Sequence, residues 1–115
     1  AEKERLRAYA DRFNARDFDA LRGLLAEDVR LEMVNRRRLA GREEVSPYFT
    51  RYGDISGWRV EPCRAEGRAA LLVGDAEVGA SGYVILLDWR DGQIAKIRDF
   101  RFASYVMDAL ALSTL

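Results

Sequence analysis

The sequence predicts an α+β domain in which helices cover one face of an antiparallel sheet. Three observations favour this fold class. The first half of the chain carries apolar residues at helical spacing, most of the second half alternates at strand spacing, and glycine-bearing turns separate the strand-like segments. With 115 residues the chain has room for one core of ordinary size. We therefore expect one domain spanning residues 1–115.

Two short helices are expected to open the domain. Residues 2–15 place Tyr9 and Phe13 one helical turn apart on an apolar face, which is typical of a helix that packs on a core. Asp17 is suited to cap a second helix, and Glu27-Asp28 are expected to close it.

A strand and a third helix are expected next. Residues 29–34 alternate apolar and polar side chains, and residues 37–40 are expected to return beside them. A helix then follows Gly41, but Pro47 cannot donate a backbone hydrogen bond in its interior. Either the helix restarts at Ser46-Pro47 or it kinks there. Its inward residues are expected to be Val45, Tyr48, Phe49 and Tyr52.

The rest of the chain reads as strands separated by turns. Residues 58–63, 69–73, 83–89 and 94–102 have strand-like patterns. A short helix is expected at residues 104–110, followed by a loose tail.

The hairpin between the last two strands admits two registers. A three-residue loop with Gly92 in the left-handed region pairs Tyr83 with Asp99 and keeps the mostly apolar odd-numbered residues on one face. A two-residue loop would set apolar residues opposite Lys96 and Arg98. We prefer the first register, which also pairs Ile85 with Ile97, Leu87 with Ala95 and Trp89 with Gln93.

Asp99 is the main candidate for a functional group. In the preferred register, Asp99 and Arg101 end an apolar face beside the phenol of Tyr83. A carboxylate in that position needs partners, or its pKa rises. Two interpretations stay open: a polar end-wall of a ligand pocket, or a structural ion pair. The candidate pocket-lining residues are Tyr9, Phe13, Met33, Tyr83, Ile85, Ile97, Asp99 and Arg101.

The opposite face of the last strand suggests a second kind of site. Phe100 and Phe102 are expected to lie on the solvent side, where adjacent aromatic residues often mark a partner surface. With Tyr105 they form the candidate interface.

Composition excludes several functions. The chain has no His and one cysteine, Cys63, so we expect no His-based catalysis, no metal site, no cofactor and no internal disulfide. Nineteen basic residues balance nineteen acidic ones, which disfavours direct DNA contact. No apolar run is long enough for a membrane span. A single unpaired thiol is compatible with the cytoplasm.

The segment YADRFNARDFDALRGLLAEDV, residues 9–29, resembles the SnoaL-like branch of the nuclear transport factor 2-like fold, and the resemblance covers nearly the whole chain. It implies a cone-shaped, strongly curved antiparallel or mixed sheet. The three helices of the N-terminal half would pack on its concave face.

Other segments are similar to the C-terminal domain of extracytoplasmic-function RNA polymerase sigma factors. They are VRLEMVN at 29–35, GREEV at 41–45, GWR at 57–59 and, most specifically, YVILLDW at 83–89 and IRDFRFASYVM at 97–107. This resemblance implies a non-catalytic regulatory domain cut from a longer cytoplasmic chain. Its expected partners are other regions of the same sigma factor and RNA polymerase, with a homodimer as a further expectation.

Ketosteroid isomerases share the cone, and the resemblance matches their helix-1 tyrosine with Tyr9. Their general base falls on Met33 and their oxyanion-hole acid on Ile85, neither of which can transfer a proton. SnoaL-type cyclases use an Asp paired with His, which this chain lacks. The alternative function is a small-molecule binder or an isomerase- or cyclase-like enzyme. There Asp99 would act as base, Tyr83 or Tyr9 would donate a hydrogen bond, and the ligand would be small and hydrophobic.

Overall fold

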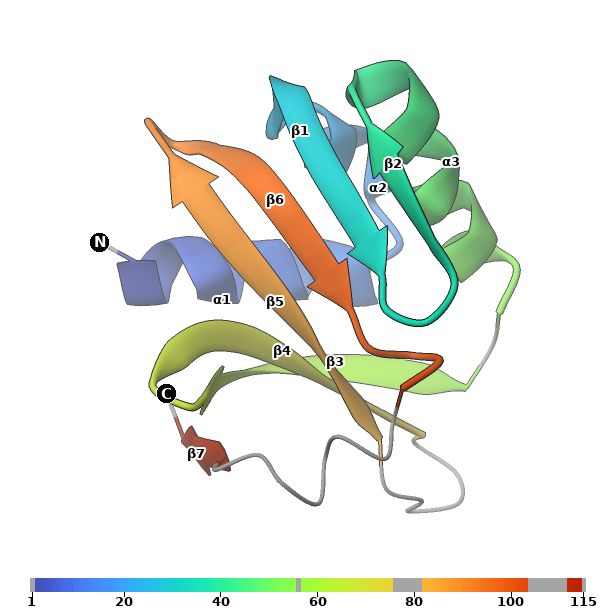
Figure 1. The fold of residues 1–115 in the computed structure, drawn as a ribbon. Helices are drawn as coiled ribbons and strands as arrows, with labels where there is room; N and C mark the ends of the chain where they lie inside the picture. Colours follow the sequence, from blue (N-terminus) through green and yellow to red (C-terminus); the bar gives the residue numbers. More distant parts are fainter. Residues whose placement is uncertain (1, 56, 76–81, 104–111, 115) are drawn as a thin grey trace.

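The computed structural model describes residues 2–55, 57–75, 82–103 and 112–114 (Figure 1). A curved mixed sheet wraps around three helices, which confirms the predicted fold class. The helices and strands in chain order are α1 (Glu2–Asn14), α2 (Phe18–Arg22), β1 (Leu25–Met33), β2 (Arg37–Ala40), α3 (Arg42–Gly53), β3 (Trp58–Ala65), β4 (Arg68–Asp75), β5 (Tyr83–Arg90), β6 (Gln93–Asp99) and β7 (Leu112–Thr114).

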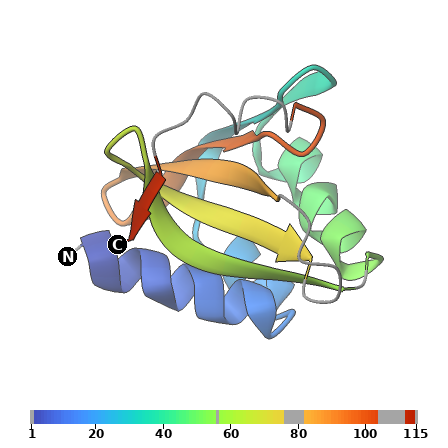
Figure 2. The ribbon, with the colours of Figure 1, turned by 90° about the horizontal axis from the view of Figure 1, so that it is seen from below.

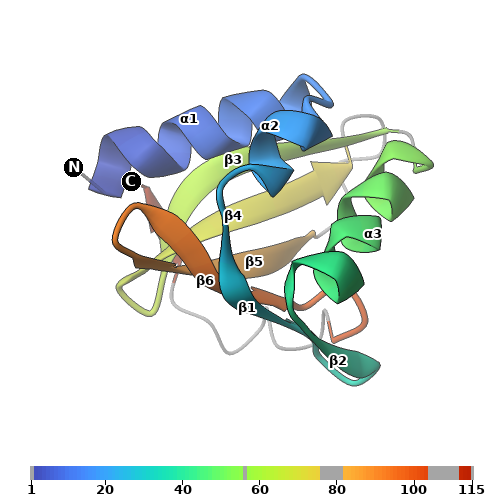
Figure 3. The same ribbon diagram turned by 90° about the horizontal axis from the view of Figure 1, so that it is seen from above.

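The strands lie in the order β2-β1-β6-β5-β4-β3-β7. Strands β1 and β6 are parallel, and the other neighbouring pairs are antiparallel. Helix α1 lies along β3 and β4, while α3 lies against β1 and β2, so both cover the concave face (Figures 2 and 3). The main core fills the space between these helices and the sheet.

The second helix is shorter than predicted. It ends at Arg22, and Gly23 caps it by donating its N–H to Asp19 O over 3.2 Å. Glu27-Asp28 do not close this helix, because they lie inside β1. The reason is the parallel pairing with β6, which begins at Leu25 opposite Ile94 and buries Leu25 completely.

The third helix runs through Pro47 as one element, so the restart at Ser46-Pro47 is wrong. Ser46 Oγ donates to Arg42 O over 2.7 Å beside the proline. The inward residues of α3 were predicted correctly: Val45, Tyr48, Phe49 and Tyr52 are all buried.

The preferred register of the β5–β6 hairpin is wrong. Asp91 and Gly92 have φ values of 53° and 80°, so they form a two-residue turn of the left-handed type that Asp-Gly favours. A bulge then shifts the register, so that Leu87 pairs with Ile97 and Ile85 pairs with Asp99. After the bulge, Ile97 and Asp99 lie on the core face as predicted, whereas before it the core residue is Ile94 rather than Ala95.

The C-terminal part also departs from the prediction. Strand β6 ends at Asp99 rather than at Phe102. Residues 112–114, expected as a loose tail, form the edge strand β7 beside β3. The predicted helix at 104–110 lies outside the described residues.

The predicted aromatic surface is only partly present. Phe100 is 7% exposed and packs on the convex side of the sheet with Cys63, Val84 and Leu86, so it is not a surface residue. The β6 backbone turns after Asp99, and the Phe100 N–H donates to Val84 O over 3.1 Å. Phe102 is 41% exposed, whereas Tyr105 lies outside the described residues.

Candidate functional site

Asp99 is the only charged residue that is buried within the described part of the chain, with 0% of its surface exposed. It is the last residue of β6 and points to α3 on the concave side of the sheet. An unpaired charge in that position would cost several kcal/mol. The carboxylate is therefore held by three hydrogen bonds.

Two of these bonds come from phenols of α3. Tyr48 Oη and Tyr52 Oη both donate to Asp99 Oδ2, over 2.7 and 2.6 Å. The two tyrosines are four residues apart, which places them on the same side of the helix. Asp99 Oδ1 accepts the backbone N–H of Arg101 over 2.8 Å.

A third phenol extends this arrangement. Tyr83 Oη, at the start of β5, lies 2.6 Å from Tyr52 Oη. When Tyr52 gives its single proton to Asp99, Tyr83 must be the donor to Tyr52. We call Asp99, Tyr48, Tyr52 and Tyr83 the carboxylate–phenol cluster.

The side chains that donate to Asp99 are therefore Tyr48 and Tyr52, and not the predicted Tyr83 and Arg101. Tyr83 reaches Asp99 only through Tyr52. Within the described residues Asp99 forms no ion pair with Arg101, whose contribution is its backbone N–H and its positive charge. Sequence reasoning placed Tyr48 and Tyr52 in the core but missed their hydroxyls. The available signal was the choice of Tyr, rather than Phe, at two positions one helical turn apart.

Asp99 is the acidic member of the cluster. Burial raises its pKa above the ordinary value, against the opposing effects of the phenol hydrogen bonds, the backbone N–H and the charge of Arg101. Burial, followed by the negative charge of Asp99, raises the pKa of Tyr48, Tyr52 and Tyr83 well above the ordinary phenol value. The phenols therefore keep their protons at neutral pH, and Asp99 is the group that titrates.

This shift makes stability depend on pH in a definite direction. Because the pKa of Asp99 is raised in the folded state, its favourable contribution is complete below the unfolded pKa, about 4, and is lost as pH rises through the folded pKa. Asp99→Asn removes that dependence. We expect urea unfolding at several pH values to show the stability difference moving in favour of Asp99→Asn above about pH 4. A difference that moves toward the wild type would contradict the raised pKa, and Asp88→Asn serves as the exposed control.

Asp99 lies in a row across three strands. Met33 of β1 pairs with Asp99 on one side, and Ile85 of β5 pairs with it on the other. Side chains at such paired positions are roughly 5 Å apart. Met33 and Ile85 are the positions to which the resemblance carries the base and the oxyanion-hole acid of isomerases. One carboxylate thus lies in the strand between the two positions at which the acids are missing.

A pocket of about 150 Å³ adjoins the cluster. Tyr48 and Tyr52 are among its lining residues, whereas their acceptor Asp99 is not. The other lining residues are Met33, Arg36, Arg37, Arg51, Arg101 and Phe102.

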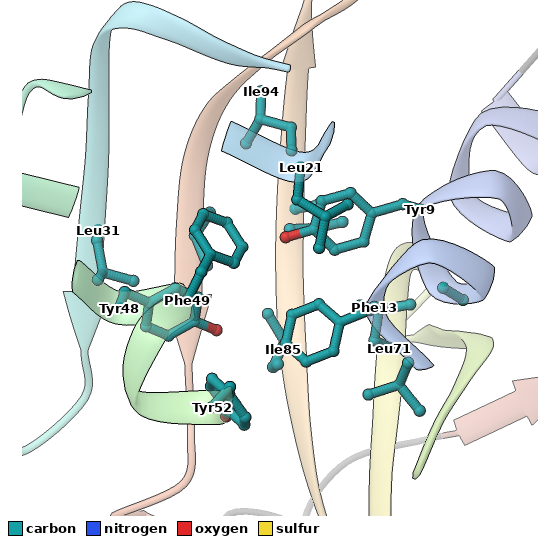
Figure 4. Close-up of a cluster of buried hydrophobic side chains, with 14 of the residues drawn as sticks. Tyr9, Phe13, Leu21, Leu31, Tyr48, Phe49, Tyr52, Leu71, Ile85 and Ile94 are labelled. Atoms are coloured by element: carbon teal, nitrogen blue, oxygen red, sulfur yellow. The ribbon is translucent and has the colours of Figure 1, made fainter. Parts of the chain in front are cut away.

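The structure places some of the predicted pocket-lining residues at this pocket and others in the main core. Met33 and Arg101 line this pocket. Tyr9, Phe13, Ile85 and Ile97 are at most 1% exposed and pack in the main core, where Figure 4 shows the first three beside Tyr48 and Tyr52.

Tyr9 has one further property. Its hydroxyl is buried and has no hydrogen-bond partner among the described residues. Buried polar atoms are paired in the great majority of cases. Burial, followed by the charge of Asp99, raises the pKa of Tyr9, so its hydroxyl keeps its proton.

No group of three or more His, Cys, Asp or Glu residues that could hold a metal ion occurs among residues 2–55, 57–75, 82–103 and 112–114. In the same part of the chain, the helices are too short and too polar to cross a membrane.

Comparisons with known proteins agree with this architecture. The model of a family described as SnoaL-like domain matches residues 6–97. No curated protein sequence matches the chain.

Several solved structures are similar. A protein of Kribbella flavida named as a proposed ketosteroid isomerase is 25% identical, with 83% of this chain and 76% of that chain covered and a TM-score of 0.58. A proposed polyketide cyclase of Xanthomonas campestris is 27% identical, with 84% and 86% covered and a TM-score of 0.57. An NTF2-like protein of unknown function from Mesorhizobium loti is 25% identical, with 84% and 86% covered and a TM-score of 0.63.

Proposed function

The chain belongs to the SnoaL-like domain family, and from that premise we propose that it binds a small organic molecule beside α3 and exchanges a proton with it. Asp99 is the proton acceptor and donor, acting through Tyr52, and Tyr48 donates a hydrogen bond to the ligand. This is the isomerase- or cyclase-like alternative, with Tyr48 in the donor role that was expected for Tyr83 or Tyr9.

One observation carries the proposal. A fully buried carboxylate accepts hydrogen bonds from two phenols that themselves line a pocket. A purely structural carboxylate needs partners but no access to a pocket. Here the two partners connect Asp99 with a ligand, so a proton can pass between them without solvent reaching the carboxylate.

The proton step is an isomerisation of a carbonyl compound. Tyr52 Oη accepts a proton from the carbon next to the carbonyl while its own proton moves to Asp99 Oδ2. With Asp99 neutral, the Tyr48 hydroxyl is free to turn and donate to the developing enolate oxygen. The reverse relay returns the proton to a different carbon. One C–H bond breaks and another forms, and no other reactant is consumed.

Two of the similar structures support this choice. Their names state a ketosteroid isomerase and a polyketide cyclase, at 25% and 27% identity. The position of Asp99 between Met33 and Ile85 supports it as well, because a carboxylate in the middle strand lies close to both positions that the resemblance connects with isomerase acids.

A small unsaturated ketone tests the proposal. We expect the wild-type protein to convert a β,γ-unsaturated cyclohexenone to its conjugated isomer, followed by ultraviolet absorbance. The ring is close to benzene in size, which a pocket of about 150 Å³ accommodates. Asp99→Asn should lower the rate by about 100-fold or more, because it removes the proton acceptor.

Asp88→Asn is the matched control for that assay. Asp88 is a half-exposed carboxylate of β5 that pairs with Arg68 at 2.6 Å, away from the pocket. Its variant should retain the wild-type rate. Equal rates for the wild type and Asp99→Asn would contradict the proposal.

A regulatory role in a sigma factor is a second candidate. The observation that favours it is the motif IRDFRFASYVM, because Asp99, Arg101 and Phe102 of the site lie within it. In this case ligand binding would alter contacts with the rest of a cytoplasmic sigma factor or RNA polymerase. Promoter-specific transcription measured with and without residues 1–115 tests it, and unchanged output would contradict it.

A further inference from the structure

The pocket beside the carboxylate–phenol cluster has a strongly cationic wall. Four of its eight lining residues are arginines, and none is acidic. They come from three separate segments: Arg36 and Arg37 from the β1–β2 hairpin, Arg51 from α3, and Arg101 from the turn after β6. The chain as a whole has equal numbers of acidic and basic residues. The positive charge is therefore concentrated at this place.

Among the described residues, these arginines lack the carboxylate partners that neighbouring arginines have. Glu32 pairs with Arg38 at 3.5 Å and with Arg98 at 3.3 Å, and both of these arginines lie outside the pocket. Within the described residues, none of the four pocket arginines forms an ion pair with a carboxylate. Arg36 and Arg101 instead stand over the ring of Phe102, 4.5 and 5.4 Å from its centre.

The other four lining residues of the pocket are apolar or aromatic: Met33, Tyr48, Tyr52 and Phe102. Three of these lining residues are almost fully buried: Met33, Tyr48 and Tyr52 are 6%, 2% and 2% exposed. A ligand that fits must combine an apolar body with a group that satisfies guanidinium donors. Guanidinium forks match carboxylate and phosphate oxygens in a planar, two-point arrangement.

We propose that the ligand of this pocket is a small organic anion: a carboxylate or phosphate ester on an apolar body about the size of benzene. The reaction of such a ligand rests on the proposed function, but its recognition does not. A concave site lined by charges of one sign concentrates ions of the opposite sign. A volume of about 150 Å³ admits one six-membered ring.

The anion also acts on the proton exchange. A negative charge bound near the phenols disfavours a second negative charge on Asp99. Binding therefore raises the pKa of Asp99, which makes its carboxylate a stronger acceptor for the proton that Tyr52 passes on. The arginines hold the anion, and the cluster responds to its charge.

Methionine methyl NMR tests the inference on the intact chain. The sequence has two methionines, Met33 and Met107, and Met107→Leu assigns their signals. The probes are benzoate, phenyl phosphate and neutral benzyl alcohol. We expect both anions to shift the Met33 methyl signal and to bind about tenfold more tightly than benzyl alcohol at low salt. The anion that binds more tightly, benzoate or phenyl phosphate, shows whether the pocket prefers a carboxylate or a phosphate.

Arginine variants test whether the pocket arginines cause the preference for anions. Replacing Arg37 and Arg51 together with Gln should weaken benzoate binding by roughly tenfold and leave benzyl alcohol binding unchanged. Arg38→Gln is the matched control, because Arg38 is an exposed neighbour outside the pocket. It should change benzoate affinity by less than about twofold.

The outcomes separate this inference from the proposed function. Equal affinity for benzyl alcohol and benzoate would overturn the anion preference, while the ketone assay with Asp99→Asn would still decide the proton exchange. Equal effects of the Arg38 variant and the double variant would overturn it too. A Met33 signal that responds to a short single-stranded oligonucleotide but not to benzoate would show a surface for phosphate backbones and would likewise overturn it.

Discussion

Replacing Asp99 with alanine is expected to lower the free energy of unfolding by about 3 kcal/mol at neutral pH. The substitution leaves the hydroxyls of Tyr48 and Tyr52 and the N–H of Arg101 without their acceptor. Each buried unpaired donor costs roughly 1–3 kcal/mol, and removal of the desolvated charge offsets part of the sum. Urea unfolding followed by circular dichroism measures the change.

Asp88→Ala provides the comparison on the neighbouring strand. The Asp88 carboxylate pairs with Arg68, but both side chains are nearly half exposed. Such a pair contributes less than about 1 kcal/mol. If the two alanine variants lost similar stability, the hydrogen bonds to Asp99 would have no special role.

Phe13→Ala is expected to lower the free energy of unfolding even more, by about 4 kcal/mol. Phe13 is 0% exposed, and its ring centre lies 5.1 Å from the rings of both Tyr52 and Trp58. Removing it opens a cavity among these rings, which cannot collapse because both strands and helices hold them. Thermal and urea unfolding both report this loss.

Phe102→Ala is the aromatic control. Phe102 is 41% exposed, and its main contacts are the guanidinium groups of Arg36 and Arg101. Its loss should cost less than about 1 kcal/mol. A Phe13 variant as stable as the Phe102 variant would mean that Phe13 lines an open chamber, which is the alternative to core packing, and does not hold the core.

Elements with local signals were predictable from the sequence. Leu6, Tyr9 and Phe13 mark α1 through their spacing alone, and all three are buried. The inward face of α3 was found in the same way. The curved mixed sheet was predicted from the family resemblance. Residue spacing alone indicates strands but does not say how they are arranged in a sheet.

Non-local pairings were harder to predict. The start of β1 at Leu25 depends on β6, a strand almost 70 residues later in the chain, whose Ile94 N–H bonds to Leu24 O at 2.8 Å. Local spacing therefore extended the second helix over residues that are strand. The β5–β6 register failed for a related reason, because Asp-Gly fixes the turn while the bulge after it depends on which residues the core accepts.

Only part of the candidate site was predicted from the sequence. Asp99 was identified because a carboxylate on an apolar face needs an explanation. Its partners come from α3, about 50 residues earlier, and the same spacing that identified Tyr48 and Tyr52 as core residues hid the role of their hydroxyls. The arginine wall was also missed, since Arg51 and Arg101 join the hairpin arginines only after folding.

Asp99 acts, in the function proposed above, as a buried proton carrier coupled to the pocket. Its side-chain carboxyl carbon can be followed directly by NMR during a pH titration, with and without saturating benzoate. We predict a pKa above that of an exposed aspartate, moved higher still when benzoate is bound. A pKa at or below the ordinary value that benzoate leaves unchanged would contradict the account.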